Sequence, residues 1–181
     1  IYSGLLALTL IGCATKSDII IEDFESGTYN KCTVEGDAFG ATPATGNYAG
    51  QQNVEGFKGK FLANSFNGGD DSRGTLISQE FTIERDYINF LLGGGMNQDT
   101  YIELVINNKS IHRSRSVVET ETLQWMTWNV KEYTGQKAVI RIVDNQRGGW
   151  GHILVDQIEQ SNTEKSVFMV DYELTFDADK K

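Results

Sequence analysis

The sequence predicts an all-β protein with the architecture of an antiparallel β-sandwich. Short apolar or alternating segments recur roughly every 8–12 residues and are separated by Gly, Asn and Asp. Only residues 130–135 have a helical pattern, and this segment spans about one turn. The 181 residues include 9 Phe, 7 Tyr and 3 Trp, which is enough apolar surface for the core of one domain.

The expected strands follow from period-two alternation and from β-branched residues. Three consecutive Ile residues at 19–21 mark the first strand, and residues 101–106 alternate most regularly. Residues 107–109, Asn-Asn-Lys, predict a hairpin turn before the next strand. In order, the expected strands are 18–24, 78–83, 87–92, 101–106, 110–115, 125–130, 137–143, 152–158 and 167–176.

Three further segments give local expectations. Residues 36–71 are rich in Gly, Asn, Ala and Thr, which predicts long loops and short strands along one edge. Three glycines at 93–95 predict a tight turn at the end of a strand, since their spacing fits no phosphate-binding loop. Trp125 and Trp128 are three residues apart, so we expect them on opposite faces of a strand, with Trp128 in the core.

The first thirteen residues are apolar and uncharged, and this stretch is shorter than the roughly 20 residues of a membrane-spanning helix. Residues 10–13, Leu-Ile-Gly-Cys, resemble a bacterial lipobox. We therefore expect a signal peptide at residues 1–12, lipidation of Cys13 with a tether at 13–18, and anchoring in the cell envelope. The alternative is a buried strand that ends in Cys13. Residues 19–162 are expected to form the sandwich, and 163–181 a linker or first strand leading to a further domain.

Composition excludes several classes of function. Asp and Glu number 25 against 16 Lys and Arg, giving a net charge of −9 that disfavours binding to nucleic-acid phosphates. Two Cys and two His are too few for a disulfide scaffold or a His-rich metal cage. The sequence contains no GxSxG, HExxH or paired CxxC motif. We therefore expect no catalytic residues in this chain.

The loop Gly148-Gly149-Trp150-Gly151-His152 is the main candidate for ligand binding. An aromatic ring flanked by glycines can stack on the apolar face of a sugar, and polar side chains can bind its hydroxyls. The expected sugar-binding residues are Trp150, Arg147, His152, Asp70 and Asp71. In the alternative interpretation, Trp150 plugs one end of the sandwich and His152 is a structural residue.

Acidic residues near the two ends of the sandwich suggest a structural calcium ion. The first and last strands of a sandwich are often neighbours, which would bring Asp23 and Glu25 close to Asp156. Carboxylates are ligands that Ca²⁺ prefers. The alternative is that these residues are solvated and bind no metal. Cys32 is expected to be a small buried residue or a free thiol.

Three sequence blocks resemble the N-terminal accessory β-sandwich domain of glycoside hydrolase family 32 lipoproteins from Bacteroides-type bacteria. The blocks are FESGTY…TVEGDAFG (24–40), GTLISQEFTIERDYINFLLGGG (74–95) and RIVDNQRGGWGHILVDQI (141–158). The resemblance covers about residues 19–160. One departure is Cys32, where the family pattern has Trp.

The resemblance implies a jelly-roll sandwich like those of carbohydrate-binding modules. It also implies that this is a non-catalytic carbohydrate-binding domain of a lipid-anchored hydrolase that acts on levan, inulin or sucrose. Its catalytic carboxylates would come from a five-bladed propeller after residue 181, because the W-x-N-D-P-N motif is absent from this chain. The implied partners are a fructan, the downstream catalytic domain, and the membrane through the lipid. The alternative function is a structural spacer that packs against the propeller and binds no sugar.

Overall fold

A computed structural model describes residues 16–166. The expected signal peptide, the expected lipidation site Cys13 and the expected strand 167–176 lie outside these residues. In the described part of the chain, no helix has the length and hydrophobicity needed to cross a bilayer.

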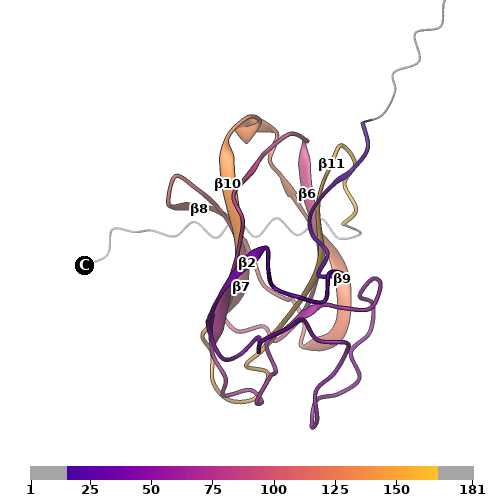
Figure 1. Cartoon of the computed structure of the whole chain (residues 1–181), viewed down its shortest axis with the longest axis vertical. Coiled ribbons are helices and arrows are strands. Elements are labelled where there is room, and N and C mark those ends of the chain that lie inside the picture. Colours follow the sequence, from indigo (N-terminus) through magenta and orange to yellow (C-terminus); the bar gives the residue numbers. More distant parts are fainter. Residues whose placement is uncertain (1–15, 167–181) are drawn as a thin grey trace, which may run out of the picture.

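The protein is an antiparallel β-sandwich, as the sequence predicts, and Figure 1 shows its two layers. The first sheet has the order β1 (Ile19–Glu22), β11 (Ile153–Ser161), β6 (Tyr87–Gly94), β9 (Thr120–Asn129), with β3 (Ala63–Asn64) also paired to β11. The second sheet has the order β2 (Cys32–Gly36), β4 (Gly74–Ser78), β10 (Lys137–Asp144), β7 (Thr100–Ile106), β8 (Lys109–Ser114), with β5 (Phe81–Thr82) also paired to β10.

The core lies between the sheets because alternate residues of the central strands face inward. Trp128 on β9 is buried there and lies 4.5 Å from Phe90 of β6, measured between ring centroids. Trp125 faces the other way, so the expectation for this pair is confirmed. It packs against a second cluster of buried residues: Ala44, Val54, Leu62, Leu91, Leu123 and Leu154.

The segment expected to form one edge of the sandwich has a different role. Ala44, Val54 and Leu62 of this segment pack on Leu91 and Leu154, which point outward from the first sheet. Its pairing with the first sheet is limited to β3, which pairs with β11, and to an isolated bridge from Glu55 to Thr122 of β9. The expectation of an edge is therefore wrong for most of this segment, which covers the outer face of the first sheet.

Two other local expectations need correction. The expected strand 78–83 is two short strands, because the Ser78 hydroxyl accepts the Ile140 N–H at 2.9 Å and interrupts the ladder along β10. In the expected turn at 93–95, Gly93 and Gly94 are the last residues of β6, where Gly94 pairs with Ile153, and Gly95 follows the end of the strand. A Cβ atom on Gly94 would lie 2.5 Å from the His152 carbonyl oxygen, so the glycine permits close strand approach.

Two turns match their predictions. Asn107 and Asn108 have φ values of 51° and 61° and join β7 to β8 in a hairpin. The one-turn helix is the 3₁₀ helix η1 (Lys131–Tyr133).

The chain leaves the sandwich across the outer face of the first sheet. The backbone amides of Lys165 and Ser166 both donate to the Thr127 hydroxyl. The Lys165 ammonium binds Asp18 and Glu159 and lies 4.9 Å from the centre of the Trp125 ring. Lys165 therefore holds the outgoing chain against the residue that precedes β1.

Cys32 has no disulfide partner among the described residues and is half-buried against the core. Burial, with a smaller contribution from the Glu22 charge, raises the pKa of its thiol to about 12. Since thiolate is the reactive form, we expect alkylation of Cys32 at pH 8 to be roughly a thousandfold slower in folded protein than for an ordinary thiol. Mass spectrometry of iodoacetamide-treated protein, with and without urea, measures this rate; equal rates would contradict the prediction.

Candidate functional site

The loop between β10 and β11 carries Trp150 and is held in place by two carboxylates. Asp71 accepts the Gly148 N–H at 3.1 Å, and Asp70 accepts the Trp150 N–H at 3.2 Å. Both aspartates therefore bind the loop through its backbone, where sequence analysis expected them to bind a sugar directly.

Trp150 has a strained backbone and an ordered ring. Its φ is 59°, a left-handed conformation that non-glycine residues rarely adopt. Its carbonyl oxygen accepts the Asn97 amide at 2.9 Å, and its ring stacks on His152 with centroids 5.7 Å apart and planes 19° apart. Strain of this kind persists only where the surroundings enforce it, and it is frequent at binding sites. The ring is half-buried, so the loop presents part of it to solvent.

His152 lies beneath Trp150 and is clamped between two acidic side chains. Its Nδ1 lies 2.7 Å from Oδ1 of Asp70, and its Nε2 lies 3.2 Å from Oε1 of Glu121. The side chain is only 3% exposed. The expectation that His152 binds sugar hydroxyls is therefore corrected, because it is buried and both ring nitrogens already have partners. This is the structural role that the sequence left as the alternative.

The charge environment favours the protonated form of His152. Burial alone would lower its pKa, but the hydrogen bonds to Glu121 and Asp70 outweigh burial and raise the pKa above 6.5. In the imidazolium form both nitrogens donate, which satisfies both carboxylates.

The clamp is part of a polar network that sequence analysis missed. Gln51 donates to Glu121 at 3.0 Å and accepts from Asn64 at 2.8 Å. Asn64 also donates to the Gly46 carbonyl at 3.0 Å. Glu121 and Asn64 are buried polar residues from distant parts of the chain, and no motif marks them. The network connects the loop that carries Gly46 and Gln51 with Asn64 of β3 and Glu121 of β9. Through Glu121 it reaches His152, which lies beneath Trp150.

A buried carboxylate adjoins the network. Asp144 ends β10 and is 1% exposed, and its Oδ2 has no hydrogen-bond partner among the described residues. Burial raises the pKa of Asp144 to about 7, although a hydrogen bond from Ser65 opposes the shift.

Of the expected sugar-binding set, the structure brings Trp150, His152 and Asp70 into contact, and Asp71 binds the same loop at the Gly148 amide. Arg147 lies on this loop and is exposed, as is Asp71. Trp150, Arg147 and Asp71 are therefore the side chains available to a ligand, while Asp70 and His152 hold the loop.

The residues expected to bind calcium lie near one another but are occupied by backbone amides. Oε1 of Glu25 accepts the amides of Lys60 and Phe61, and Asp23 accepts the Glu25 amide. Oδ2 of Asp156 accepts the Lys58 amide at 2.6 Å.

The fit of these residues to a metal ion is incomplete. Within residues 16–166 no group of three His, Cys, Asp or Glu side chains converges as a metal site. Oδ1 of Asp156 is nevertheless buried without a partner, and the Glu25 and Asp23 charges act on this carboxylate. A cation at this position would therefore contact the unpaired Oδ1 of Asp156, and the Glu25 and Asp23 carboxylates lie nearby.

A second constellation missed by sequence analysis lies on the outer face of the second sheet. Glu103 of β7 pairs in register with Arg113 of β8 and Arg141 of β10. The arginines bind its carboxylate at 2.7 and 3.0 Å, and Arg113 lies 3.8 Å from the centre of the Tyr101 ring. Strand pairing assembles this group from residues that are far apart in sequence.

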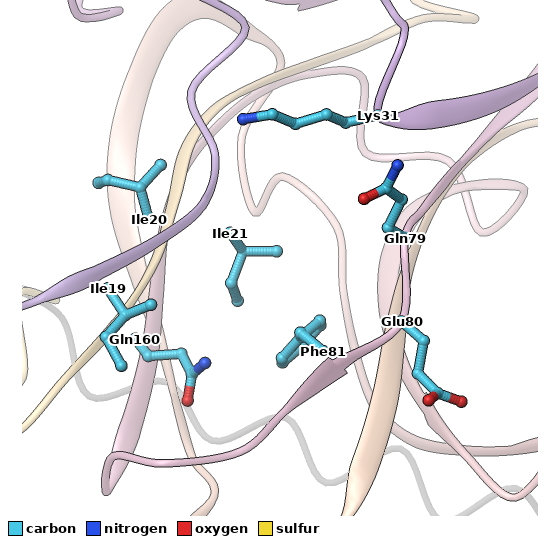
Figure 2. Close-up of a pocket in the computed structure, with 8 residues that line it drawn as sticks. All are labelled: Ile19, Ile20, Ile21, Lys31, Gln79, Glu80, Phe81 and Gln160. Atoms are coloured by element: carbon cyan, nitrogen blue, oxygen red, sulfur yellow. The ribbon is translucent and has the colours of Figure 1, made fainter.

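Figure 2 shows a pocket of about 250 Å³ at the open edge between the sheets. Ile21 and Phe81 point into it, and Lys31 and Gln79 lie at its rim. The amide of Gln160 is already bonded to Glu84 and Thr82. None of the expected site residues lines this pocket.

The chain is similar to one part of a longer curated protein. No family model matches the sequence. A curated protein named "Putative glycosyl hydrolase ecdE", from Aspergillus rugulosus, is 43% identical over 156 residues. The match covers 84% of this chain and 22% of that protein. The chain thus spans about a fifth of the length of the curated relative.

Similar solved structures support the fold. The K3 and K1 cleaved adhesin domains of Lys-gingipain from Porphyromonas gingivalis both superpose with a TM-score of 0.50 at 14% identity. K3 covers 80% of this chain and K1 covers 82%, in each case with 99% of the adhesin domain. At this identity the likeness concerns the β-sandwich alone.

Proposed function

We propose that this chain is a non-catalytic, carbohydrate-binding accessory domain of a glycoside hydrolase. The Trp150 ring stacks on a sugar ring, and Arg147 donates hydrogen bonds to its hydroxyls. The observation that carries the proposal is the construction of the loop: two aspartates bind its backbone, and a buried histidine supports the ring of a strained tryptophan. A tryptophan that only filled the end of the sandwich would be buried, whereas Trp150 is only half-buried.

The curated relative supports the enzymatic context. It is named as a glycosyl hydrolase, and the matched segment is a minor part of its length. An accessory domain beside a separate catalytic domain is consistent with both facts. It is also consistent with a sequence that lacks the common hydrolase motifs.

The finer part of the proposal concerns the substrate and the anchor. We propose that the sugar is a fructan and that the parent enzyme is attached to the cell envelope through Cys13. This part rests on the three sequence blocks that resemble the family 32 accessory domain and on the lipobox-like segment. The catalytic domain that follows and the membrane are the partners this implies.

Isothermal titration with levan and inulin oligosaccharides tests the proposal. Trp150→Ala is expected to weaken binding about tenfold, since an aromatic contact contributes about 0.5–1.5 kcal/mol beyond its buried area. Trp125→Ala is the matched control, because this half-buried tryptophan lies on the outer face of the first sheet. The affinity of the Trp125→Ala variant for the oligosaccharides should equal that of the wild type. No detectable heat at millimolar ligand would instead support a spacer that binds no sugar. Equal affinity for Trp150→Ala would show that the sugar binds away from this tryptophan, which contradicts the proposed site.

A further inference from the structure

We propose that His152 is a positioning residue, which holds the Trp150 ring in its ligand-binding geometry only while the imidazole is protonated. This inference rests on the proposed function, because it concerns the same tryptophan. It adds a property that the stacking contact does not require: binding that weakens as pH rises.

The carboxylate of Asp70 contacts both His152 and Trp150. Oδ1 of Asp70 binds Nδ1 of His152 at 2.7 Å, and its Oδ2 accepts the Trp150 amide at 3.2 Å. A Cβ atom on Gly151 would lie 2.5 Å from the Asp70 carbonyl oxygen, so the two loops are in close contact. A change at the His152–Asp70 bond therefore reaches the backbone of Trp150 through one side chain.

The number of N–H donors on the His152 ring depends on its protonation. Imidazolium donates from both nitrogens, whereas neutral imidazole donates from only one. Glu121 and Asp70 accept from opposite sides, and ionised carboxylates only accept. After deprotonation, one carboxylate faces a nitrogen lone pair at hydrogen-bond distance. That arrangement is repulsive, so the ring or a loop must move.

The groups that face His152 set the direction of the effect. Asp70 comes from the loop after β3, Glu121 from β9 and Asp144 from β10, and all three act on the imidazole electrostatically. The two ring neighbours, Phe66 and Trp150, carry no charge. His152 has a raised pKa, so the clamp is complete below pH 6.5 and is lost as pH rises through that raised value.

Asp144 also titrates within the pH range of the experiment below, so its effect must be distinguished from that of His152. The pKa of Asp144 is raised to about 7, mainly by burial. Its protonation removes a negative charge near His152, whereas the clamp depends on a proton on the imidazole. Asp144→Asn fixes this neighbour in an uncharged form and leaves both hydrogen bonds to His152 in place.

The experiment follows Trp150 by its indole N–H signal in ¹⁵N-resolved NMR spectra of the sugar-free protein from pH 5 to 9. Fructan affinity is then measured at the same pH values. The wild-type indole signal is expected to shift with the same midpoint as the His152 ring protons, and affinity to fall about fivefold or more across that midpoint. Asp144→Asn should keep the transition.

Glu121→Gln removes one carboxylate and is expected to move both midpoints down by about one pH unit. Asp70→Asn should do the same, and it provides a second variant if Glu121→Gln fails to fold. Glu119→Gln is the matched control, since this exposed carboxylate lies two residues from Glu121 and should leave the midpoints unchanged.

Two outcomes would overturn the inference. One is an indole signal that does not follow the His152 midpoint, and the other is an affinity that stays constant across it. A wild-type protein that binds no sugar at any pH would overturn the proposed function instead. The indole titration would still report whether His152 positions Trp150, so the two failures are distinguishable.

Discussion

Asp156→Asn is expected to make the protein more stable than the wild type at pH 8, by an amount on the order of 4 kcal/mol, and to have little effect at pH 4. Asp156 is fully buried at the β11 bulge. Burial is the main cause that raises its pKa from 3.8 to about 7, and the Glu25 and Asp23 charges add to it. An asparagine keeps an oxygen for the Lys58 amide and carries no charge.

The sign of the effect follows from proton binding. Between pH 3.8 and about 7 the folded carboxyl holds a proton that the unfolded one has lost. The contribution of Asp156 to the free energy of unfolding therefore falls as pH rises through this window and is constant on either side. Asp156→Asn removes this contribution and leaves that of Asp144, whose pKa is also raised to about 7. Urea unfolding at pH 4, 6 and 8 in the presence of a chelator measures the contribution of Asp156.

Glu119→Gln is the control, because Glu119 is exposed and lies outside the Trp150 loop; it should show the wild-type difference in stability between pH 4 and pH 8. A calcium arm tests the expected ion: stabilisation of the wild type by millimolar Ca²⁺ at pH 8, absent from Asp156→Asn, would show that this carboxylate binds a cation. A variant that is less stable than the wild type at pH 8 in chelator would show that the buried charge is compensated.

Gly95→Ala should disrupt the Trp150 loop and destabilise the fold by about 3 kcal/mol. A Cβ atom on Gly95 would lie 1.8 Å from the carbonyl oxygen of Trp150, which is far closer than van der Waals contact allows. The atom it meets is backbone, so no side chain can rotate away. The loop must separate from β6, and Trp150 then loses its place over His152.

Gly149→Ala provides a matched control on the loop itself. A Cβ atom on Gly149 would meet nothing within 4 Å, so this variant should keep wild-type stability. Urea unfolding gives the stability of both variants, and fructan titration gives their affinity. Equal stability and affinity for Gly95→Ala and Gly149→Ala would show that the loop does not depend on this contact.

The elements that could be predicted from sequence are those with a local signal. Residues 101–106 alternate cleanly and form β7, and Asn107-Asn108 form the expected hairpin turn. β2 gave no signal because it lies at the edge of its sheet and four of its five residues are exposed. The run of three glycines suggested a turn because sequence alone does not show how closely β11 approaches β6.

The candidate site was only partly predictable for the same reason. A glycine-flanked tryptophan is visible in the sequence, and so are the adjacent Asp70 and Asp71. The support beneath Trp150 is not visible, because Glu121 lies 31 residues from His152 and reaches it only through sheet pairing. Burial also changed the role assigned to His152. The sequence suggested that it binds sugar, whereas in the structure it supports Trp150.

The pairing of β1 with β11 has a mechanical consequence. Ile19 lies opposite Gln160, so the chain enters and leaves this strand pair at the same end. A force that pulls the two ends apart would load the hydrogen bonds of the pair one after another, like a zipper, and not all at once in shear. The contacts just outside the pair would carry that load first: Arg85 with the Ser17 carbonyl, the Lys165 ammonium with Asp18, and the Ser166 amide with Thr127. Under tension, the resistance of the sandwich therefore depends on these few surface contacts before it depends on the core.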